Sequence, residues 1–418
     1  MKARGTVRVP GDKSISHRAL ICAAVASGRS TITNLLRSAD VESTASVLRL
    51  LGVSIPALAD EVIVDGVGIG GFREPGLPLQ CGNSGTTARM IAGVVAASPF
   101  ATRLEGDPSL SRRPMRRVTE PLTAMGARIE FERDDGLPMT VYGGDLSGIA
   151  WNTRASSAQT KSAILFAGLL GGVSVTVREA RRSRDHTERM LASVGVPLTV
   201  TETSVSLTPI AEIEPLRLTV PADPSSAAYL AALGALADEG EVRIPGVCVN
   251  PTRTGFLTAL TRMGGSVRFI EKRKVAGEET ATVVVAPRKL HGIRVGADEV
   301  PAMIDELPLL ACVAAASGVD LDVSGAEELR VKESDRISAV VSNLRATGAQ
   351  AEERRDGFRI AAGRRPLRGR VTTHGDHRIA MAFGVIGWVD GNDIEVDNRD
   401  CVDISYPTFW SDVAALVQ

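Results

Sequence analysis

Apolar and polar positions along the chain form a pattern that repeats six times. Each copy begins with a polar segment rich in Gly, Ser or Asp and continues into a helix-length run of Ala and Leu. A glycine and a β-branched strand follow, and most copies then add a second helical pattern, a short Gly turn and another strand. Each polar start together with its apolar run occupies residues 11–28, 81–98, 154–172, 221–240, 301–318 or 374–388. This repetition predicts six structural units of one kind.

The length of the repeat indicates what each copy forms. The polar starts of the copies lie near Ser14, Ser84, Ser157, Ser225, Asp305 and His377. Their spacing of about 70 residues is longer than the roughly 20–50 residues of solenoid repeats, so each copy is predicted to be a small βαβαββ unit. Because the opening helices are apolar on nearly every face, we expect them to be buried inside a ring of sheets.

The polar starts have an electrostatic consequence. A helix N-terminus carries unpaired N–H groups and about half a positive charge, so it attracts anions. If the starts of the opening helices converge, they form one cleft that attracts anions. The first start, GDKSISHR at residues 11–18, is not a phosphate-binding P-loop, because Asp12 stands where the second glycine of GxxxxGK[ST] is required.

Composition narrows the class of protein. The chain has 418 residues, of which 44% are hydrophobic and 23% charged, and this suits two or three globular domains. A net charge of −1 and an aromatic content of 4% argue against a nucleic-acid partner. Any anion site must therefore come from a local cluster of cations.

The cysteines and the apolar runs indicate the compartment. There are five cysteines, far apart and without a CxxC pair, which predicts reduced thiols and neither a disulfide framework nor a zinc site. The N-terminus lacks the apolar segment of a signal peptide, and the apolar runs are too short to cross a bilayer. These features predict a cytoplasmic protein with no membrane partner.

The first two helix starts carry candidate binding residues. Ser14 and Arg18 share one helix face because they are four residues apart, and Lys13 lies at the helix start. In GNSGTTAR, Gly85 has no side chain and so lets the backbone approach a ligand closely. A capped helix with solvated cations would explain each of these residues equally well.

Three further segments of the first half offer groups suited to phosphates, carboxylates and hydroxyls. Arg113 belongs to an arginine cluster that Pro114 stiffens, which suits a fixed guanidinium fork. Ser157, Gln159 and Ser183 are neutral hydrogen-bonding residues near later helix starts. Charge runs are usually solvated faces and serines are usual helix caps, so these alternatives stay open here.

Paired carboxylates and cations mark the second half of the chain. Asp305 and Glu306 precede a very apolar helix, where a carboxylate is either a cap or a tuned general base. In RVKESDR, the charges of Lys332, Glu333 and Arg336 interleave, as they also would in a surface ion-pair helix.

The last helix start reads HGDHR and contains His374, Asp376, His377 and Arg378. A lone histidine near a helix is usually structural, and no Cys or acidic cluster supports a metal site here. No single segment is decisive. Their joint occurrence at matching places in successive repeats is what favours a shared binding site.

Together these segments resemble a known family. PGDKSISHRAL, GNSGTTAR, RRPM, SSAQTKSA, SRDHTERM, DELPLLA, RVKESDR and GDHRIAM occur in this order over essentially the whole chain and are similar to those of the EPSP synthase family of enolpyruvyl transferases. The resemblance implies an α/β fold of two inside-out barrels (a prism), each of three βαβαββ repeats with helices buried inside sheets. It implies one domain formed by residues 1–10 and 222–418, a second formed by 11–221, and an active site in the cleft between them.

The resemblance also implies a reaction. The family transfers the enolpyruvyl group of phosphoenolpyruvate to the 5-hydroxyl of shikimate 3-phosphate, releases phosphate through a tetrahedral intermediate, and uses no metal or organic cofactor. By this resemblance the chain takes part in aromatic amino acid biosynthesis through the shikimate pathway, and we expect it to be a monomer. Both substrates are polyanions, as the helix starts and the arginines predict.

Residue roles follow by matching motifs to the family. Asp305 would take the 5-hydroxyl proton, Glu333 would protonate the methylene carbon, and Lys13 would assist proton transfer, although the residues alone do not decide which carboxylate does which. The matched phosphoenolpyruvate contacts are Lys13, Gly85, Arg113, Gln159, Arg336 and Arg378. The matched shikimate 3-phosphate contacts are Lys13, Ser14, Arg18, Ser157, Gln159, Ser183, Asp305 and Lys332.

The chain departs from the family pattern at three positions. Ile404 stands where many relatives carry a lysine, Glu328 where some carry Asn, and Ala158 where some carry a second serine. These differences put minor contacts in question, above all one phosphate contact. Gly85 lies at the position that the family links to competition between glyphosate and phosphoenolpyruvate, so we expect glyphosate to compete here.

Two other functions remain to be compared. The sister enzyme that acts on UDP-N-acetylglucosamine shares the fold and the donor but typically uses a loop cysteine, and the matching segment LEGDPSLSRRPM has none. A non-catalytic binder of phosphorylated metabolites would keep the arginines but would not need Asp305, Glu333 and Lys13 together.

Overall fold

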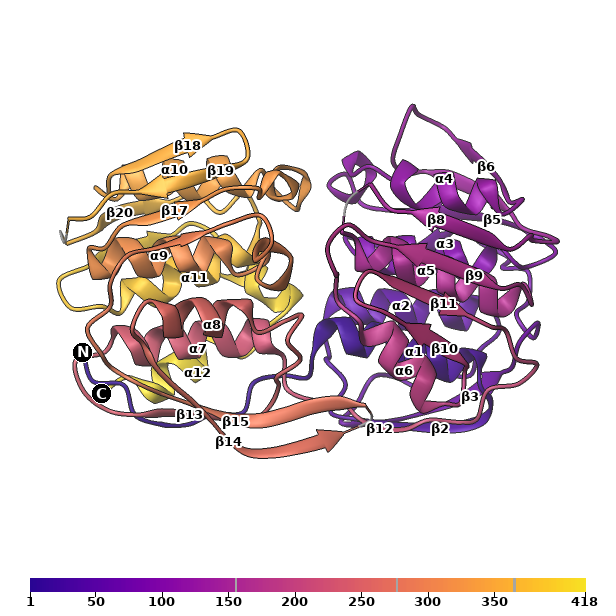
Figure 1. Cartoon of the computed structure of the whole chain (residues 1–418), viewed down its shortest axis with the longest axis horizontal. Coiled ribbons are helices and arrows are strands. Elements are labelled where there is room, and N and C mark those ends of the chain that lie inside the picture. Colours follow the sequence, from indigo (N-terminus) through magenta and orange to yellow (C-terminus); the bar gives the residue numbers. More distant parts are fainter. Residues whose placement is uncertain (155, 276, 364–365) are drawn as a thin grey trace. The chain divides into compact units, whose positions relative to one another are not determined.

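The computed structural model describes residues 1–154, 156–275, 277–363 and 366–418. The chain divides into two compact units (Figure 1). Unit 1 contains Met1–Pro10, Pro221–Lys274 and Glu279–Gln418, and unit 2 contains Gly11–Val220 and Val275–Glu278. The chain thus changes units after Pro10 and after Val220, and four residues of a later hairpin also group with unit 2, which the sequence did not indicate.

Unit 2 contains three opening helices and three second helices, in alternation along the chain. The opening helices are α1 (Lys13–Val25), α3 (Gly85–Val95) and α5 (Ala158–Leu170). The second helices are α2 (Ala39–Leu50), α4 (Arg116–Ala124) and α6 (His186–Ser193). A short 3-10 helix, Leu110–Arg112, precedes α4. All six α-helices fall in segments with a predicted helical pattern.

The strands of unit 2 form three sheets. In hydrogen-bonding order, the first is β12 (Arg217–Thr219), β2 (Ser27–Thr33) and β3 (Glu61–Val67). The second is β4 (Leu79–Gln80), β5 (Ala101–Glu105), β7 (Met139–Tyr142) and β6 (Arg128–Phe131). The third is β10 (Leu198–Val200), β11 (Ser204–Leu207), β9 (Val175–Arg178) and β8 (Ile149–Asn152). In the second sheet β4 and β5 are parallel and β7 is antiparallel to both neighbours, as a βαβαββ unit requires.

Unit 1 repeats this plan. Its opening helices are α7 (Pro224–Leu236), α9 (Leu307–Ser317) and α11 (His377–Gly387), and its second helices are α8 (Gly255–Arg262), α10 (Arg336–Ala346) and α12 (Phe409–Leu416). Its first sheet is β1 (Gly5–Thr6), β13 (Val242–Cys248), β15 (Glu278–Ala286) and β14 (Ser266–Val275). The second is β16 (Ile293–Val295), β17 (Leu321–Val323), β19 (Gly357–Ile360) and β18 (Ala351–Arg354). The third is β20 (Arg368–Val371) with β21 (Asp393–Val396). Its short 3-10 helices are Val300–Ala302, Glu327–Val331 and Asp400–Ile404.

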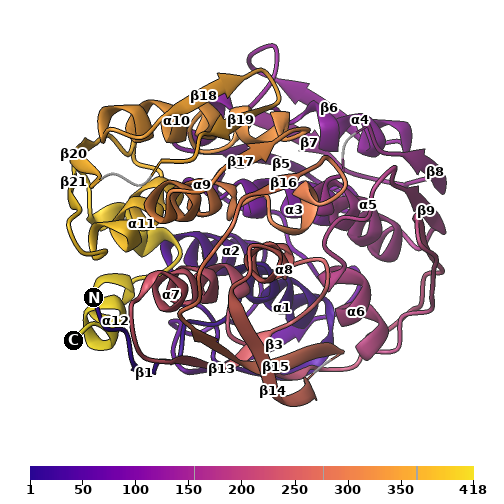
Figure 2. The same ribbon diagram turned by 60° about the vertical axis from the view of Figure 1, so that its left-hand side comes forward.

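The opening helices form the interior of each unit, as their all-round apolar pattern predicts. In α9 every residue from Leu307 to Ala316 is buried, and in α7 every residue from Pro224 to Ala235 is buried. In unit 1, α7, α9 and α11 lie against one another, with strands outside them (Figure 2). The predicted α/β class with helices inside sheets is confirmed.

The sheets obtain strands from distant parts of the sequence. The N-terminal strand β1 pairs in parallel with β13, and β12 pairs in parallel with β2. Each of these strands supplies a sheet edge that its neighbours in sequence do not provide. Among the described residues no helix combines the length and apolar character needed to cross a membrane.

Candidate active site

All six opening helices begin within two residues of the predicted positions. Five of the six N-cap side chains accept a backbone N–H: Asp12 from Ile15, Ser84 from Thr87, Ser157 from Thr160, Asp223 from Ser225, and Asp376 from Arg378. Ser84 and Ser157 are therefore helix caps, as one interpretation of the sequence allowed. The cap role leaves the cations inside α1, α3, α5 and α11 to be explained.

In unit 2, the start of α1 places a lysine and an arginine against polar partners. Lys13, the first residue of α1, forms an ion pair with the buried Asp40. Arg18 is 2% exposed, and its guanidinium donates to Thr187 Oγ1 at 2.6 Å, Ser162 Oγ at 2.9 Å and the Ser14 carbonyl at 2.9 Å. Burial lowers the pKa of Arg18 to about 10, although the negative charge of Glu188 opposes this shift. Arg18 thus stays protonated near neutral pH.

Two arginines lie near the start of α3 in unit 2: Arg89 on α3 itself, and Arg113 directly after the 3-10 helix that precedes α4. Arg89 Nη1 donates to Gln159 Oε1 at 2.8 Å, and Gln159 Nε2 donates to Thr86 Oγ1 at 2.9 Å. Arg113 Nη2 donates to Asn83 Oδ1 at 2.5 Å. A Cβ atom on Gly85 would lie 2.7 Å from Arg89 Nη1 and 3.6 Å from Arg113 Nη1. Gly85 therefore leaves the space in which the Arg89 guanidinium lies, whereas a Cβ atom would make only an ordinary contact with the Arg113 guanidinium.

Ser183 lies on the segment between β9 and α6. It is 4% exposed, and its backbone N–H donates to Glu179 Oε2 at 3.3 Å. Its hydroxyl has no hydrogen-bond partner among the described residues. A buried hydroxyl without a partner carries a desolvation cost that a polar ligand would remove.

In unit 1, a buried arginine connects three helix starts. Arg336, the first residue of α10, is 1% exposed and donates to three carboxylates: Asp305 Oδ1 at 3.0 Å, Glu333 Oε2 at 2.6 Å and Asp376 Oδ2 at 2.8 Å. Burial lowers the pKa of Arg336, but the three carboxylates raise it well above its usual value. The Nζ of Lys332 lies 3.6 Å from Asp305 Oδ1.

Arg378 is the second buried arginine of this cluster. It is 6% exposed at the start of α11. Burial lowers its pKa, whereas Tyr229, Asp305 and Glu306 are the leading causes of a net rise. Unit 1 therefore brings Asp305, Lys332, Glu333, Arg336 and Arg378 into one electrostatic cluster, and unit 2 does the same for Gly85, Arg113 and Gln159.

Sequence reasoning did not find the partners of these residues. Asp40 holds Lys13, and Asp376 holds Arg336. Arg89 was left open between a functional and a structural role, and it now joins Gly85 and Gln159. The only signal for Asp40 was a carboxylate in the first turn of α2, which a helix start favours in any protein.

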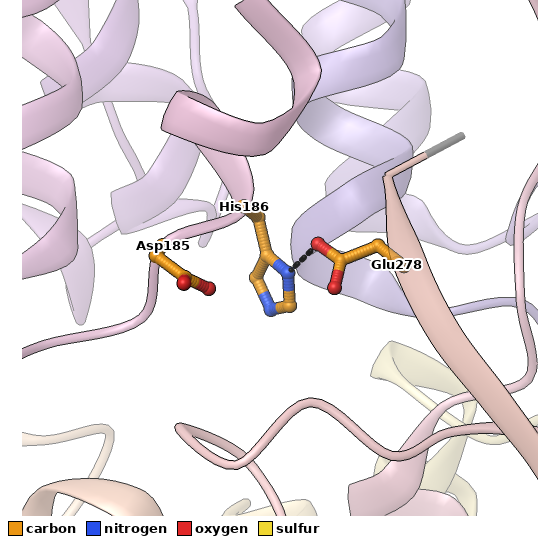
Figure 3. A group of neighbouring side chains, drawn as sticks. All are labelled: Asp185, His186 and Glu278. Atoms are coloured by element: carbon orange, nitrogen blue, oxygen red, sulfur yellow. Dashed lines mark hydrogen bonds and ion pairs between the residues drawn. The ribbon is translucent and has the colours of Figure 1, made fainter. Parts of the chain in front are cut away.

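One further cluster has ligand types that bind metals. Asp185, His186 and Glu278 are buried in unit 2, and their donor atoms lie within 4.8 Å of one another (Figure 3). His186 Nδ1 lies 2.7 Å from Glu278 Oε1, and Arg182 and Arg189 each bond to Asp185 at 2.9 Å. Burial raises the pKa of Glu278, but the hydrogen bond from His186 and the charges of His186 and Arg189 lower it overall. We interpret the group as an ion-pair network that ties residue 278 to α6.

Comparisons with known proteins identify the family. The family model described as EPSP synthase (3-phosphoshikimate 1-carboxyvinyltransferase) matches residues 1–413. A 3-phosphoshikimate 1-carboxyvinyltransferase from Aquifex aeolicus (strain VF5) is 45% identical, covering 100% of this chain and 98% of the relative. A protein of the same name from Sulfurihydrogenibium sp. (strain YO3AOP1) is 43% identical, covering 98% and 96%.

Solved structures give the same result. An EPSP synthase from Acinetobacter baumannii superposes with a TM-score of 0.88 at 36% identity, covering 100% of this chain and 96% of that one. The enolpyruvyl transferase NikO from Streptomyces tendae shares the fold, with a TM-score of 0.76 at 16% identity, covering 99% and 95%. From the ordered motifs, the fold and these full-length matches, the chain belongs to the EPSP synthase (3-phosphoshikimate 1-carboxyvinyltransferase) family.

Proposed function

We propose that the residues at the helix starts carry out the family's reaction in this chain, with substrate contacts drawn from both units. The reaction transfers the enolpyruvyl group of phosphoenolpyruvate to the 5-hydroxyl of shikimate 3-phosphate in the shikimate pathway. The observation that carries the proposal is the placement of buried or half-buried cations in the first two turns of helices α1, α3, α10 and α11: Lys13, Arg18, Arg89, Arg336 and Arg378. Helix N-termini and guanidinium groups both favour phosphate and carboxylate ligands.

Shikimate 3-phosphate is assigned mainly to unit 2. Its proposed contacts are Lys13, Ser14, Arg18, Ser157, Gln159 and Ser183, joined by Asp305 and Lys332 of unit 1. The unpartnered, buried hydroxyl of Ser183 supports this assignment because a substrate oxygen would satisfy it. The hydrogen bonds that hold Arg18 support it too, since they fix the guanidinium before the ligand arrives.

Phosphoenolpyruvate is assigned to residues from both units. Its proposed contacts are Lys13, Gly85, Arg113, Gln159, Arg336 and Arg378. The two guanidinium groups of Arg89 and Arg113, both near Gly85, support a small anion at this place. We add Arg89 to this group as the residue that orients Gln159.

The chemistry requires one proton to be removed and one to be added. In the addition step, Asp305 takes the 5-hydroxyl proton as the oxygen bonds to C2, and Glu333 gives a proton to the methylene carbon. In the elimination step the C2–O bond to phosphate breaks, and a methyl proton returns to the protein to restore the double bond. Both carboxylates bond to Arg336, which supports their action on neighbouring atoms. We propose that no metal or organic cofactor takes part.

A phosphate-release assay tests the proposed function. The purified chain is mixed with phosphoenolpyruvate and either shikimate 3-phosphate or UDP-N-acetylglucosamine. We expect stoichiometric phosphate only with shikimate 3-phosphate. Release with the sugar nucleotide would assign the chain to the sister reaction, and release with neither acceptor would favour a non-catalytic binder.

We further propose that glyphosate competes with phosphoenolpyruvate, because Gly85 has no side chain to displace Arg89, which lies with Arg113 at the proposed phosphoenolpyruvate contacts. Initial rates at millimolar glyphosate should fall, and added phosphoenolpyruvate should restore them. An unchanged rate would refute this point alone.

We also propose that the chain works as a cytoplasmic monomer. Sedimentation at micromolar concentration tests the oligomeric state.

A further inference from the structure

A lysine outside the matched ligand set lies at the centre of unit 2. Lys161 belongs to α5, and its side chain is 2% exposed. Its Nζ lies 2.8 Å from Glu179 Oε2 and 2.8 Å from Glu188 Oε1, and these two side chains are 5% and 6% exposed. One buried cation thus lies between two buried carboxylates.

Lys161 keeps its positive charge, although burying this group of charges costs free energy. Burial lowers the pKa of Lys161, yet the charges of Glu188 and Glu179 raise it overall, so the lysine stays protonated. Glu179 Oε1 and Glu188 Oε2 have no hydrogen-bond partner among the described residues. Burying three charges costs desolvation energy that an apolar cluster would avoid. Fold stability alone is therefore a poor explanation for it.

The carboxylates of Glu179 and Glu188 connect Lys161 to the proposed substrate contacts. The same Glu179 oxygen that binds Lys161 accepts the backbone N–H of Ser183 at 3.3 Å. Glu188 lies in the first turn of α6, next to Thr187, and its charge also acts on Arg18. Thr187 accepts from Arg18 Nε at 2.6 Å.

The residue after Lys161 completes the connection. Ser162 Oγ accepts from Arg18 Nη2 at 2.9 Å and lies 2.6 Å from Thr187 Oγ1. Two hydrogen-bonded groups therefore lie side by side around Lys161, on α1, α5, α6 and the segment that carries Ser183. They are joined through the sequence neighbours Lys161–Ser162 and Thr187–Glu188.

We propose that Lys161, with Glu179 and Glu188, is a positioning residue that sets Ser183 and Arg18 for shikimate 3-phosphate. This inference rests on the proposed function of that site. Lys161 does not touch the substrate. It acts through Glu179 on the backbone of Ser183 and through Glu188 on the helix that holds Arg18.

The test compares Lys161→Met and Glu179→Ala with the wild-type chain. Glu179→Ala leaves Lys161 and Glu188 as a balanced pair, so it keeps the test open if Lys161→Met does not fold. Both variants should raise the KM and the equilibrium Kd for shikimate 3-phosphate by about tenfold to a hundredfold, as expected when binding groups are misplaced. The KM for phosphoenolpyruvate should change less than about threefold, a split that a general structural defect does not produce.

Arg49→Met is the matched control. It removes an ion pair with Glu42 on α2, in the same unit but outside the network, and should leave both KM values unchanged. An unchanged Kd for shikimate 3-phosphate in the folded variants would overturn the proposal. A parallel rise in both KM values, or failure of both variants to fold, would do the same by assigning the network to stability. Absence of phosphate release by the wild-type chain would instead refute the proposed function.

Discussion

At the residue scale, two cations of the candidate site already bind carboxylates. Lys13 pairs with Asp40, and Arg336 pairs with Asp305, Glu333 and Asp376. These pairs balance charge inside the protein and hold the cations in place. We therefore expect an anionic substrate to compete for these cations and to change the partners of Asp305 and Glu333.

The carboxylate of Asp305 is the first residue to test. Asp305→Asn should lower kcat by about a hundredfold or more, because the amide cannot accept the hydroxyl proton. Thermal stability should change little, since Arg336 keeps two other carboxylates. Asp322→Asn, which removes a charge paired with Arg354 in the same unit, is the control. Equal rates for Asp305→Asn and the control would exclude Asp305 as the base.

Gly85 provides a test of the phosphoenolpyruvate contacts. Gly85→Ala places a Cβ 2.7 Å from Arg89 Nη1, so the guanidinium must move. The clash is with the end of a flexible side chain, so the fold should remain intact while the KM for phosphoenolpyruvate rises several-fold. Steady-state kinetics and a melting curve measure the two effects. A lower melting temperature with an unchanged KM would place the ligand elsewhere.

The ion pair of Glu278 predicts a dependence of stability on pH. The folded-state pKa of Glu278 is lowered overall, by the hydrogen bond from His186 and the charges of His186 and Arg189, against the effect of burial. Its contribution to stability is thus complete above the unfolded pKa, about 4.5, and is lost as pH falls through the folded pKa. Urea unfolding from pH 7 down to about 3 should show a shallower loss of stability for Glu278→Gln than for wild type. Identical slopes would exclude this role.

At the element scale, small residues let the interior helices approach closely. A Cβ on Gly93 of α3 would lie 2.3 Å from the Ala163 carbonyl oxygen on α5. The same two helices carry Gly85 and Gln159 at their starts, so their spacing sets how these residues meet. Close packing inside unit 2 therefore contributes directly to the geometry of the proposed binding site.

This spacing can be tested by adding one methyl group. Gly93→Ala should destabilise the protein by about 1–3 kcal/mol, because backbone atoms must shift to admit it. Gly144→Ala, where no atom lies within 4 Å of the new Cβ, is the matched control and should be nearly neutral. Chemical denaturation measures both. A neutral Gly93→Ala would show that α3 and α5 separate at little cost.

At the scale of the whole molecule, the sequence predicted the repeats and the helix starts well. Long apolar runs with capping residues, as in α7 and α9, specify buried helices almost by themselves. The pairing of β12 with β2 joins residues far apart in sequence, and short strands of this kind carry little local signal. The ion pair of Lys13 with Asp40 was likewise not predicted, because the starts of α1 and α2 come together only in the folded unit.

Family membership decides what the residues alone left open. The sequence allowed a transferase acting on UDP-N-acetylglucosamine or a non-catalytic binder, and the full-length match to the EPSP synthase family resolves this choice. The roles of single residues depend on the motif match and on the geometry within each unit. They remain proposals that the variants above test one at a time.

A crystal structure of the chain with shikimate 3-phosphate and phosphoenolpyruvate tests the central proposal most directly. The proposal is that helix starts from both units bind one pair of anionic substrates. It predicts Lys13 and Arg113 of unit 2, and Arg336 and Arg378 of unit 1, within hydrogen-bond distance of the same phosphoenolpyruvate. Substrates bound to one unit alone, with the arginines of the other unit still on their carboxylates, would contradict it.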